Sequence, residues 1–137
     1  MMGRSNVTQV GYYDPTKDEA VEIDGCTADG VPSLLGVILG LSSQRGHPTL
    51  ELLRGDGSSL DLSTDGARAY LVYVNQLGES FHSTGGQGAE PLVFDYFGSW
   101  SEARASCLVS VEDALECTNA FALAGSADTA RVLFEPE

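Results

Sequence analysis

The chain has 137 residues and carries 20 acidic against 7 basic side chains, a formal net charge of −13. A field of that sign repels nucleic acid and anionic membranes and attracts basic partners, so binding to DNA or RNA through phosphates is excluded. Negative charge can also simply keep a protein soluble, without any basic partner, and this second interpretation stays open. The length suits one hydrophobic core, and we expect residues 1–137 to form a single domain.

Cysteine usage and the N-terminal residues bear on the compartment. The chain has three cysteines, an odd number without regular spacing: Cys26, Cys107 and Cys117. This pattern argues against a disulfide framework. Free thiols suit a reducing compartment. The N-terminal residues show no apolar signal-peptide core, and the longest apolar run, residues 34–41, is too short to span a membrane. We therefore expect a cytoplasmic protein that does not bind a membrane.

The first part of the chain predicts two strands and then a helix. β-branched and aromatic residues favour strands at 7–13 and 20–23, followed by turn-rich residues 24–32. Residues 33–44 have the helical period, and four aliphatic residues would form the buried stripe: Leu34, Leu35, Ile38 and Leu41. Gly36 and Gly40 would let this helix approach the sheet closely.

The middle of the chain predicts an antiparallel meander. Strands are expected at 49–53, 59–63 and 67–75, separated by turn signals at Asp56-Gly57 and Asp65-Gly66. Residues 79–83 are expected to extend it. Residues 84–89 contain three glycines in six positions and are expected to form a flexible loop.

The last third predicts strand, strand, helix, strand. Residues 90–97 and 100–109 would form a hairpin through Gly98-Ser99. Ser110 suits a helix N-cap, with Asp113 three residues later, and Gly125 suits the C-cap. Residues 131–134 would form a closing strand. The residues of this helix that should face the sheet are small or apolar: Val111, Ala114, Leu115, Thr118, Phe121 and Ala122.

Together these elements predict an α+β fold. We expect one mainly antiparallel sheet of about five to seven strands, with two principal helices packed on one of its faces. The other face would then stay wet or meet a partner.

The last third also resembles a known family. The helix opening at 109–114, the Phe-x-x-x-Gly helix end at 121–125 and the short closing strand are similar to those of the Imm1 family of bacterial immunity proteins. The resemblance implies a protein that binds a cognate toxin in the cytoplasm and neutralises it. Toxins of such systems often carry nucleic-acid deaminase domains, so the resemblance implies a basic deaminase as the partner.

The chain lacks the motifs that catalysis would require. A zinc deaminase needs His-x-Glu and Pro-Cys-x-x-Cys, and neither is present. Two histidines do not build a three-ligand metal site. A nucleophilic pair of Cys107 with His82 is formally possible, but a small buried cysteine is the better interpretation. We expect no enzyme activity, cofactor or metal.

A surface that mixes aromatic and acidic residues is the remaining candidate site. It could imitate nucleic acid by presenting rings and negative charge to a basic cleft. Alternatively the rings complete the core, as we expect for Phe97, and the acids protect a sheet edge. The candidate toxin-binding residues are Tyr73, Glu90, Asp95, Tyr96, Trp100 and Glu102. The rival hypotheses are a small cytosolic enzyme on the same scaffold and a chaperone or adaptor for a basic effector.

Overall fold

The structure, a computed structural model, describes residues 7–26, 30–41, 46–124 and 132–137. Strands take up the largest share of these residues, and two α-helices accompany them, so the predicted α+β class is confirmed. The elements in chain order are β1 (Val7–Asp14), β2 (Glu19–Cys26), α1 (Val31–Gly40), β3 (His47–Pro48), β4 (Leu50–Arg54), β5 (Ser59–Thr64), β6 (Arg68–Val74), β7 (Ser80–Thr84), β8 (Leu92–Tyr96), β9 (Ser99–Ala103), β10 (Val109–Ser110), α2 (Val111–Ala124) and β11 (Leu133–Pro136).

The main sheet is antiparallel and larger than the sequence predicted. Its strand order is β11-β7-β6-β5-β4-β1-β2, and β10 pairs with β6, which gives eight strands within the described residues. The predicted five to seven strands were therefore too few. The prediction of a single sheet was also wrong, because β3, β8 and β9 form a second sheet of three strands. β8 pairs in parallel with β3 instead of joining β7, and the residue pattern of a strand does not specify such a partner.

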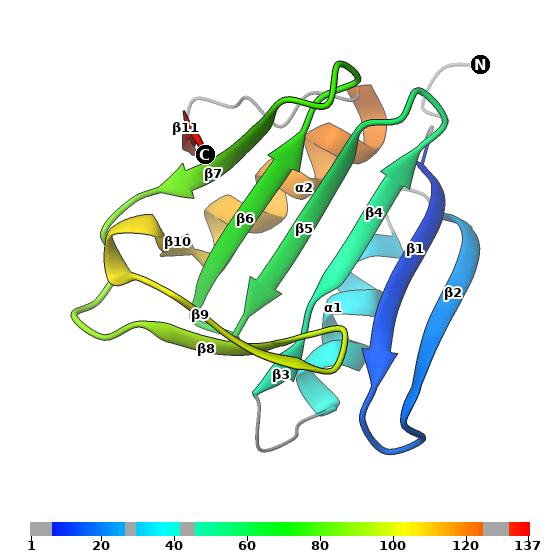
Figure 1. Cartoon of the computed structure of the whole chain (residues 1–137), viewed down its shortest axis with the longest axis horizontal. Coiled ribbons are helices and arrows are strands. Elements are labelled where there is room, and N and C mark those ends of the chain that lie inside the picture. The colour runs from blue at the N-terminus through cyan, green and yellow to red at the C-terminus, as the bar shows by residue number, and fades with distance from the viewer. Residues whose placement is uncertain (1–6, 27–29, 42–45, 125–131) are drawn as a thin grey trace.

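Both helices cover the same face of the main sheet, as predicted (Figure 1). Alternate residues of the central strands point toward them, because successive side chains of a strand face opposite sides. The core on this side contains Leu50, Leu52, Leu60, Leu62, Leu71, Ile38 and Phe121, all completely buried.

Helix α2 forms much as its sequence predicts. The Ser110 hydroxyl accepts a hydrogen bond from the backbone N–H of Asp113 at 3.2 Å, which confirms the N-cap. Thr118 and Phe121 are buried against the sheet side, and Glu112 is exposed. The predicted C-cap, Gly125, lies outside the described residues, as does the start of the predicted closing strand.

Helix α1 spans residues 31–40, shifted from the predicted 33–44, and residues 42–45 lie outside the described part. Leu35 and Ile38 are buried, as expected. The prediction of close packing at Gly36 and Gly40 was wrong. Both glycines are exposed, and no atom lies within 4 Å of the place that a Cβ would occupy on either one.

The predicted strand over residues 100–109 ends early. β9 stops at Ala103, and Ala105–Cys107 form a 3₁₀ turn. This turn hydrogen bonds to the end of β7, because the hydroxyl of Ser83 donates to the Cys107 carbonyl at 2.7 Å and accepts from the Leu71 N–H at 3.0 Å. These bonds replace the ladder that a longer hairpin would have made.

The second face of the main sheet is partly covered, which corrects the expectation that it is left free by the helices. The β8–β9 hairpin lies across one end of this face, opposite the helices (Figure 1). A second, smaller core forms beneath it from Leu92, Phe94, Ala103 and Leu108, with Tyr70 of β6 packed against them. The rest of this face, toward β1 and β2, is called the open face below.

Candidate functional site

Three carboxylates lie in one line across the open face: Glu22 on β2, Glu51 on β4 and Asp61 on β5. Gly11 of β1 pairs with both Glu22 and Glu51, and Glu51 pairs with Asp61. Directly paired residues of an antiparallel sheet project from the same face, so the three side chains share one face: Glu51 and Asp61 are direct neighbours, and Glu22 is separated from Glu51 by Gly11. We call Glu22, Glu51 and Asp61 the carboxylate row.

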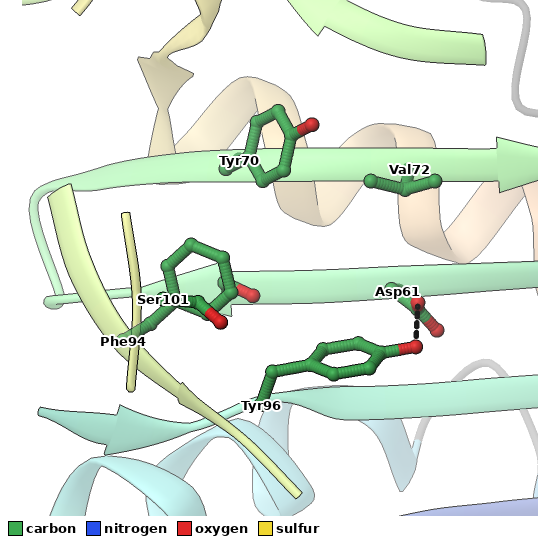
Figure 2. A pocket seen from close by; sticks show the side chains of 7 residues that line it. Asp61, Tyr70, Val72, Phe94, Tyr96 and Ser101 are labelled. Atoms are coloured by element: carbon green, nitrogen blue, oxygen red, sulfur yellow. Dashed lines mark hydrogen bonds between the residues drawn. The ribbon is translucent and has the colours of Figure 1, made fainter. Parts of the chain in front are cut away.

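The tip of the β8–β9 hairpin lies over this row. The Tyr96 hydroxyl donates a hydrogen bond to Oδ2 of Asp61 at 3.4 Å (Figure 2). The Tyr96 and Phe97 rings meet edge to face, with centroids 5.2 Å apart. A Cβ on Gly11 would stand 3.9 Å from the Phe97 ring, so the gap that glycine leaves in the row accommodates this ring.

Phe97 adopts a backbone conformation that is unusual for an aromatic residue. Its φ is 49°, and Gly98, the next residue, has a φ of 91°. Positive φ at two successive positions is typical of a tight hairpin turn, where asparagine and glycine are preferred. The left-handed region costs a residue with a Cβ roughly 1–2 kcal/mol. The turn therefore retains strain at the residue whose ring covers Gly11.

Two small pockets flank the hairpin tip. One, of about 120 Å³, lies between Phe94 and Tyr96 of the hairpin and Asp61 and Tyr70 of the sheet (Figure 2). The other, also about 120 Å³, is lined by Phe97 together with Gly11 and two members of the carboxylate row, Glu22 and Glu51. Acidic and aromatic side chains thus meet on both sides of the tip.

Asp61 is the most perturbed acid of this surface. Burial, and then the negative charge of Glu51, raise its pKa to about 7, against the opposing effect of the Tyr96 hydrogen bond. Burial and the charge of Asp61 also raise the pKa of Tyr96 to about 12. A side-chain hydrogen bond with Glu51 also favours the protonated, neutral form of Asp61 and raises its pKa.

The predicted contact residues of the hairpin fall on two sides. Tyr96 is 41% exposed and points toward the main sheet, whereas Trp100, 57% exposed, and Glu102 point away from it. Val93 pairs with Glu102 and is also exposed. Glu90 is exposed just before β8, and its carbonyl accepts a hydrogen bond from Arg68.

The structure separates the other two predicted contact residues from this surface. Asp95 is completely buried, and its Oδ1 accepts a hydrogen bond from the Gly98 N–H at 2.7 Å, which closes the turn. Tyr73 lies on the helix side of the main sheet, with its ring 6.0 Å from that of Phe121. Its position is on the opposite face of the sheet from Tyr96.

Sequence reasoning did not select Glu22, Glu51 or Asp61. A signal for two of them was present, because Glu51 and Asp61 stand five residues before and after Asp56 of the turn, each with leucines beside it. Equal separation from a turn places two residues opposite one another in a hairpin, on the face that the leucines leave. The path of the β8–β9 hairpin over them has no comparable signal.

The histidine and cysteine of the alternative nucleophilic pair do line one pocket, of about 260 Å³, together with Tyr70, Arg104 and Glu137. Nδ1 of His82 lies 3.0 Å from the Ser83 carbonyl, and Cys107 is a buried free thiol. Among the described residues, no group of three or more histidine, cysteine or acidic side chains is placed to hold a metal ion. In the same part of the chain, neither helix has the length and apolarity needed to cross a membrane.

The fold and the site define a small, strongly acidic α+β protein with a charged and aromatic sheet face. The family described as Immunity protein Imm1 matches residues 18–132, most of the chain, and the chain therefore belongs to the Imm1 immunity protein family. Membership implies an immunity protein with a cognate toxin as its partner. None of the curated proteins compared with the chain matches it.

Proposed function

We propose that this protein binds its cognate toxin in the cytoplasm and covers the active site or substrate cleft of that toxin, which is a basic nucleic-acid deaminase. The single observation that carries this proposal is the acidic and aromatic surface at the hairpin. A single-stranded nucleic acid presents negative charge and flat stacking surfaces to the protein that binds it. The carboxylate row and the aromatic rings at the hairpin tip present the same two features.

The charge of the chain fits such a partner. An enzyme that acts on nucleic acid holds the phosphates with lysine and arginine, so the rim of its cleft is cationic. A protein of net charge −13 is drawn to that rim and is steered toward it over several ångströms. Complementary charge of this kind speeds association and disfavours wrong partners.

The proposed contacts are the exposed residues of the hairpin and its approach: Glu90, Val93, Tyr96, Trp100 and Glu102. Large exposed aromatic side chains are favoured as anchors at the centre of interfaces. In this proposal the other two predicted residues stabilise the fold and do not contact the toxin. Asp95 fixes the turn that presents Tyr96, and Tyr73 packs in the core on the helix side.

A deamination assay with the purified toxin domain tests the proposal. A cytosine-containing single strand is incubated with the toxin and increasing amounts of this protein, and uracil formation is measured. We expect uracil formation to stop as the complex saturates, and a variant carrying both Trp100→Ala and Glu102→Lys to inhibit less. A complex that forms while uracil formation continues undiminished would contradict occlusion of the active site or cleft.

A further inference from the structure

Strand β2 ends the main sheet on the side opposite β11, and its outer edge has no pairing strand among the described residues (Figure 1). With eight residues it is the longest of the strands that end the two sheets, since β11 has four residues, β9 five and β3 two. An edge strand presents unpaired N–H and C=O groups with which another chain can pair. β2 is thus the longest open sheet edge in the described part of the chain.

The hydrogen-bond pattern of the sheet determines which peptide groups of β2 point outward. The Arg54 N–H donates to the Ser58 carbonyl at 2.9 Å, so the peptide groups of Arg54 face β5. Successive residues of a strand bond to opposite sides, and Glu51 therefore bonds to its partner Gly11 on β1. Gly11 then makes no bond toward β2, and its partner Glu22 directs its N–H and C=O away from β1.

The two faces of β2 differ in chemistry. By the same alternation Ala20, Glu22 and Asp24 direct their peptide groups outward, and the side chains of all three are exposed on the open face. On the helix face Val21 packs, partly buried, against the main core, and Ile23 is 36% exposed. A strand laid against β2 would meet carboxylates on the open face and aliphatic side chains on the helix face.

We propose that the outer edge of β2 pairs with a β-strand of the cognate toxin in which basic and apolar residues alternate. This inference rests on the proposed function and specifies how the partner is bound. β2 contains three acidic residues and no lysine or arginine, so basic side chains of the incoming strand face opposite charges across the pair. The apolar side chains of that strand lie on the other face and extend the core beyond Val21 and Ile23.

The charge of β2 also decides between the toxin and a second copy of this chain as the occupant. Two β2 strands paired with each other would bring Glu22 and Asp24 against the carboxylates of the other strand, and like charges directly opposite one another are destabilising. Lysine and proline, which commonly protect edge strands, are absent from β2. Its carboxylates repel acidic strands and leave the edge open to a basic one.

The edge is continuous with the surface that is proposed to contact the toxin. The pocket beside Phe97 is also lined by Ala20, Val21 and Glu22, so the hairpin tip and β2 border the same hollow. A toxin that covers the hairpin tip therefore comes within reach of β2, and one partner can occupy both places.

Hydrogen exchange followed by NMR tests the pairing on the full-length protein, alone and with the cognate toxin domain. The amide protons of Val21 and Ile23 bond to β1 and should be protected in both states. Those of Ala20, Glu22 and Asp24 should exchange quickly in the free protein and at least about tenfold more slowly in the complex. Outward amides that keep their free exchange rates in the complex would overturn the pairing.

Two variants at one position separate the backbone bond from the charge. Glu22→Ala removes the carboxylate and keeps the N–H, whereas Glu22→Pro removes both. Proline is tolerated where the N–H of an edge strand faces solvent, so the bonds between β2 and β1 should persist. We expect the toxin to bind Glu22→Pro about tenfold more weakly than Glu22→Ala, and equal binding by the two variants would overturn the backbone pairing.

A charge reversal tests the basic character of the incoming strand. Asp24→Lys places a cation opposite that strand and should weaken binding several-fold. Glu112→Lys, on the exposed side of α2, changes the net charge equally and should leave binding unchanged. Toxin binding that is the same for Asp24→Lys as for Glu112→Lys would overturn the proposed charge of the partner strand.

The uracil assay, run on the same complex, separates this inference from the proposed function. A complex that stops uracil formation while the outward amides of β2 keep their free exchange rates would overturn the strand pairing and leave the immunity function standing. Protection of these alternate amides in a complex that still forms uracil would support the pairing and contradict occlusion of the active site or cleft. Absence of any complex would overturn both.

Discussion

The hydroxyl of Tyr96, at the end of β8, lies 3.4 Å from Oδ2 of Asp61 in the middle of β5, and this hydrogen bond joins the hairpin to the main sheet. Asp61 is an unfavourable residue to bury, because desolvation and the charge of Glu51 both oppose its ionised form. The contact therefore positions the aromatic tip over the carboxylate row at a cost in stability. That arrangement is the basis of the predictions on pH and binding.

Asp61→Asn should stabilise the protein at alkaline pH. The pKa of Asp61 is raised from 3.8 to about 7 in the folded state, so the folded protein binds this proton more tightly than the unfolded chain does. The contribution of Asp61 to stability is then fully present below pH 3.8 and is lost as the pH rises to 7. Asparagine does not titrate, so its advantage should grow over the same range to at most about 4 kcal/mol.

Urea denaturation of both proteins at several pH values measures this difference. Asp14 and Asp56, whose pKa values are lowered, act in the opposite direction, but they are common to both proteins and cancel in the comparison. A stability difference that stays the same from acid to alkaline pH would show that Asp61 is ionised normally in the folded protein.

Phe121→Ala should cost roughly 3–5 kcal/mol of unfolding free energy, because it leaves a large cavity in the core. Phe121 is completely buried, and its ring lies beneath the Arg54 guanidinium at 5.7 Å. Arg54 also donates to the Phe121 carbonyl at 2.9 Å, so the end of α2 is tied to β4 here. Leu123→Ala, at a position of the same helix that is 47% exposed, is the matched control and should change stability little.

Chemical denaturation midpoints decide this prediction. Equal midpoints for Phe121→Ala and the original protein would mean that the ring does not fill the core between α2 and the sheet.

The sequence predicted the parts of the fold that depend on local pattern. Helix α2 was predicted well because small or apolar residues recur at helical spacing behind a serine N-cap. The meander was predicted well because turn dipeptides separate strands with alternating residues. The prediction from the sequence failed where pairing between residues far apart in the chain determines the structure. The route of β8 to β3, and the hydrogen bonds of Ser83 that end β9 early, join residues far apart in the chain.

The candidate site shows the same division. Trp100 and Glu102 were selected because they stand out near a turn; both are exposed, and their contact with the toxin stays a prediction. Asp95 was selected by the same reasoning, but its carboxylate closes the hairpin turn. Glu51 and Asp61 come together with aromatic rings only where the hairpin crosses over them, and that crossing depends on tertiary contacts.

Phe97→Gly should separate the role of the ring from the stability of the turn. Glycine accepts a φ of 49° without strain, and this gain offsets the loss of a half-buried ring. We expect the net change in unfolding free energy to stay within about 1 kcal/mol. Binding to the toxin should nevertheless weaken, because the cover over Gly11 is lost. Calorimetric unfolding and binding measured on the same variant check both statements; severe destabilisation would show that the ring chiefly supports the fold.

Charge reversal on the hairpin should slow association with the toxin. Glu102→Lys places a cation beside Trp100 and opposes the attraction of a basic partner, whereas Trp100→Ala removes an anchor and should mainly speed dissociation. Glu112→Lys on the exposed side of α2 changes the net charge equally and is the control. Stopped-flow kinetics at increasing salt should show association slowing, because the Debye length falls from about 10 Å at 0.1 M to about 3 Å at 1 M. Association that is insensitive to salt would contradict charge steering.

The central claim is that this protein neutralises its cognate toxin. The most direct measurement is survival of cells that express that toxin together with this protein, with soluble protein confirmed in each culture. We predict survival with the original protein and with Glu112→Lys, and reduced survival with the variant carrying Trp100→Ala and Glu102→Lys. Death of cells that contain abundant soluble original protein would contradict the account.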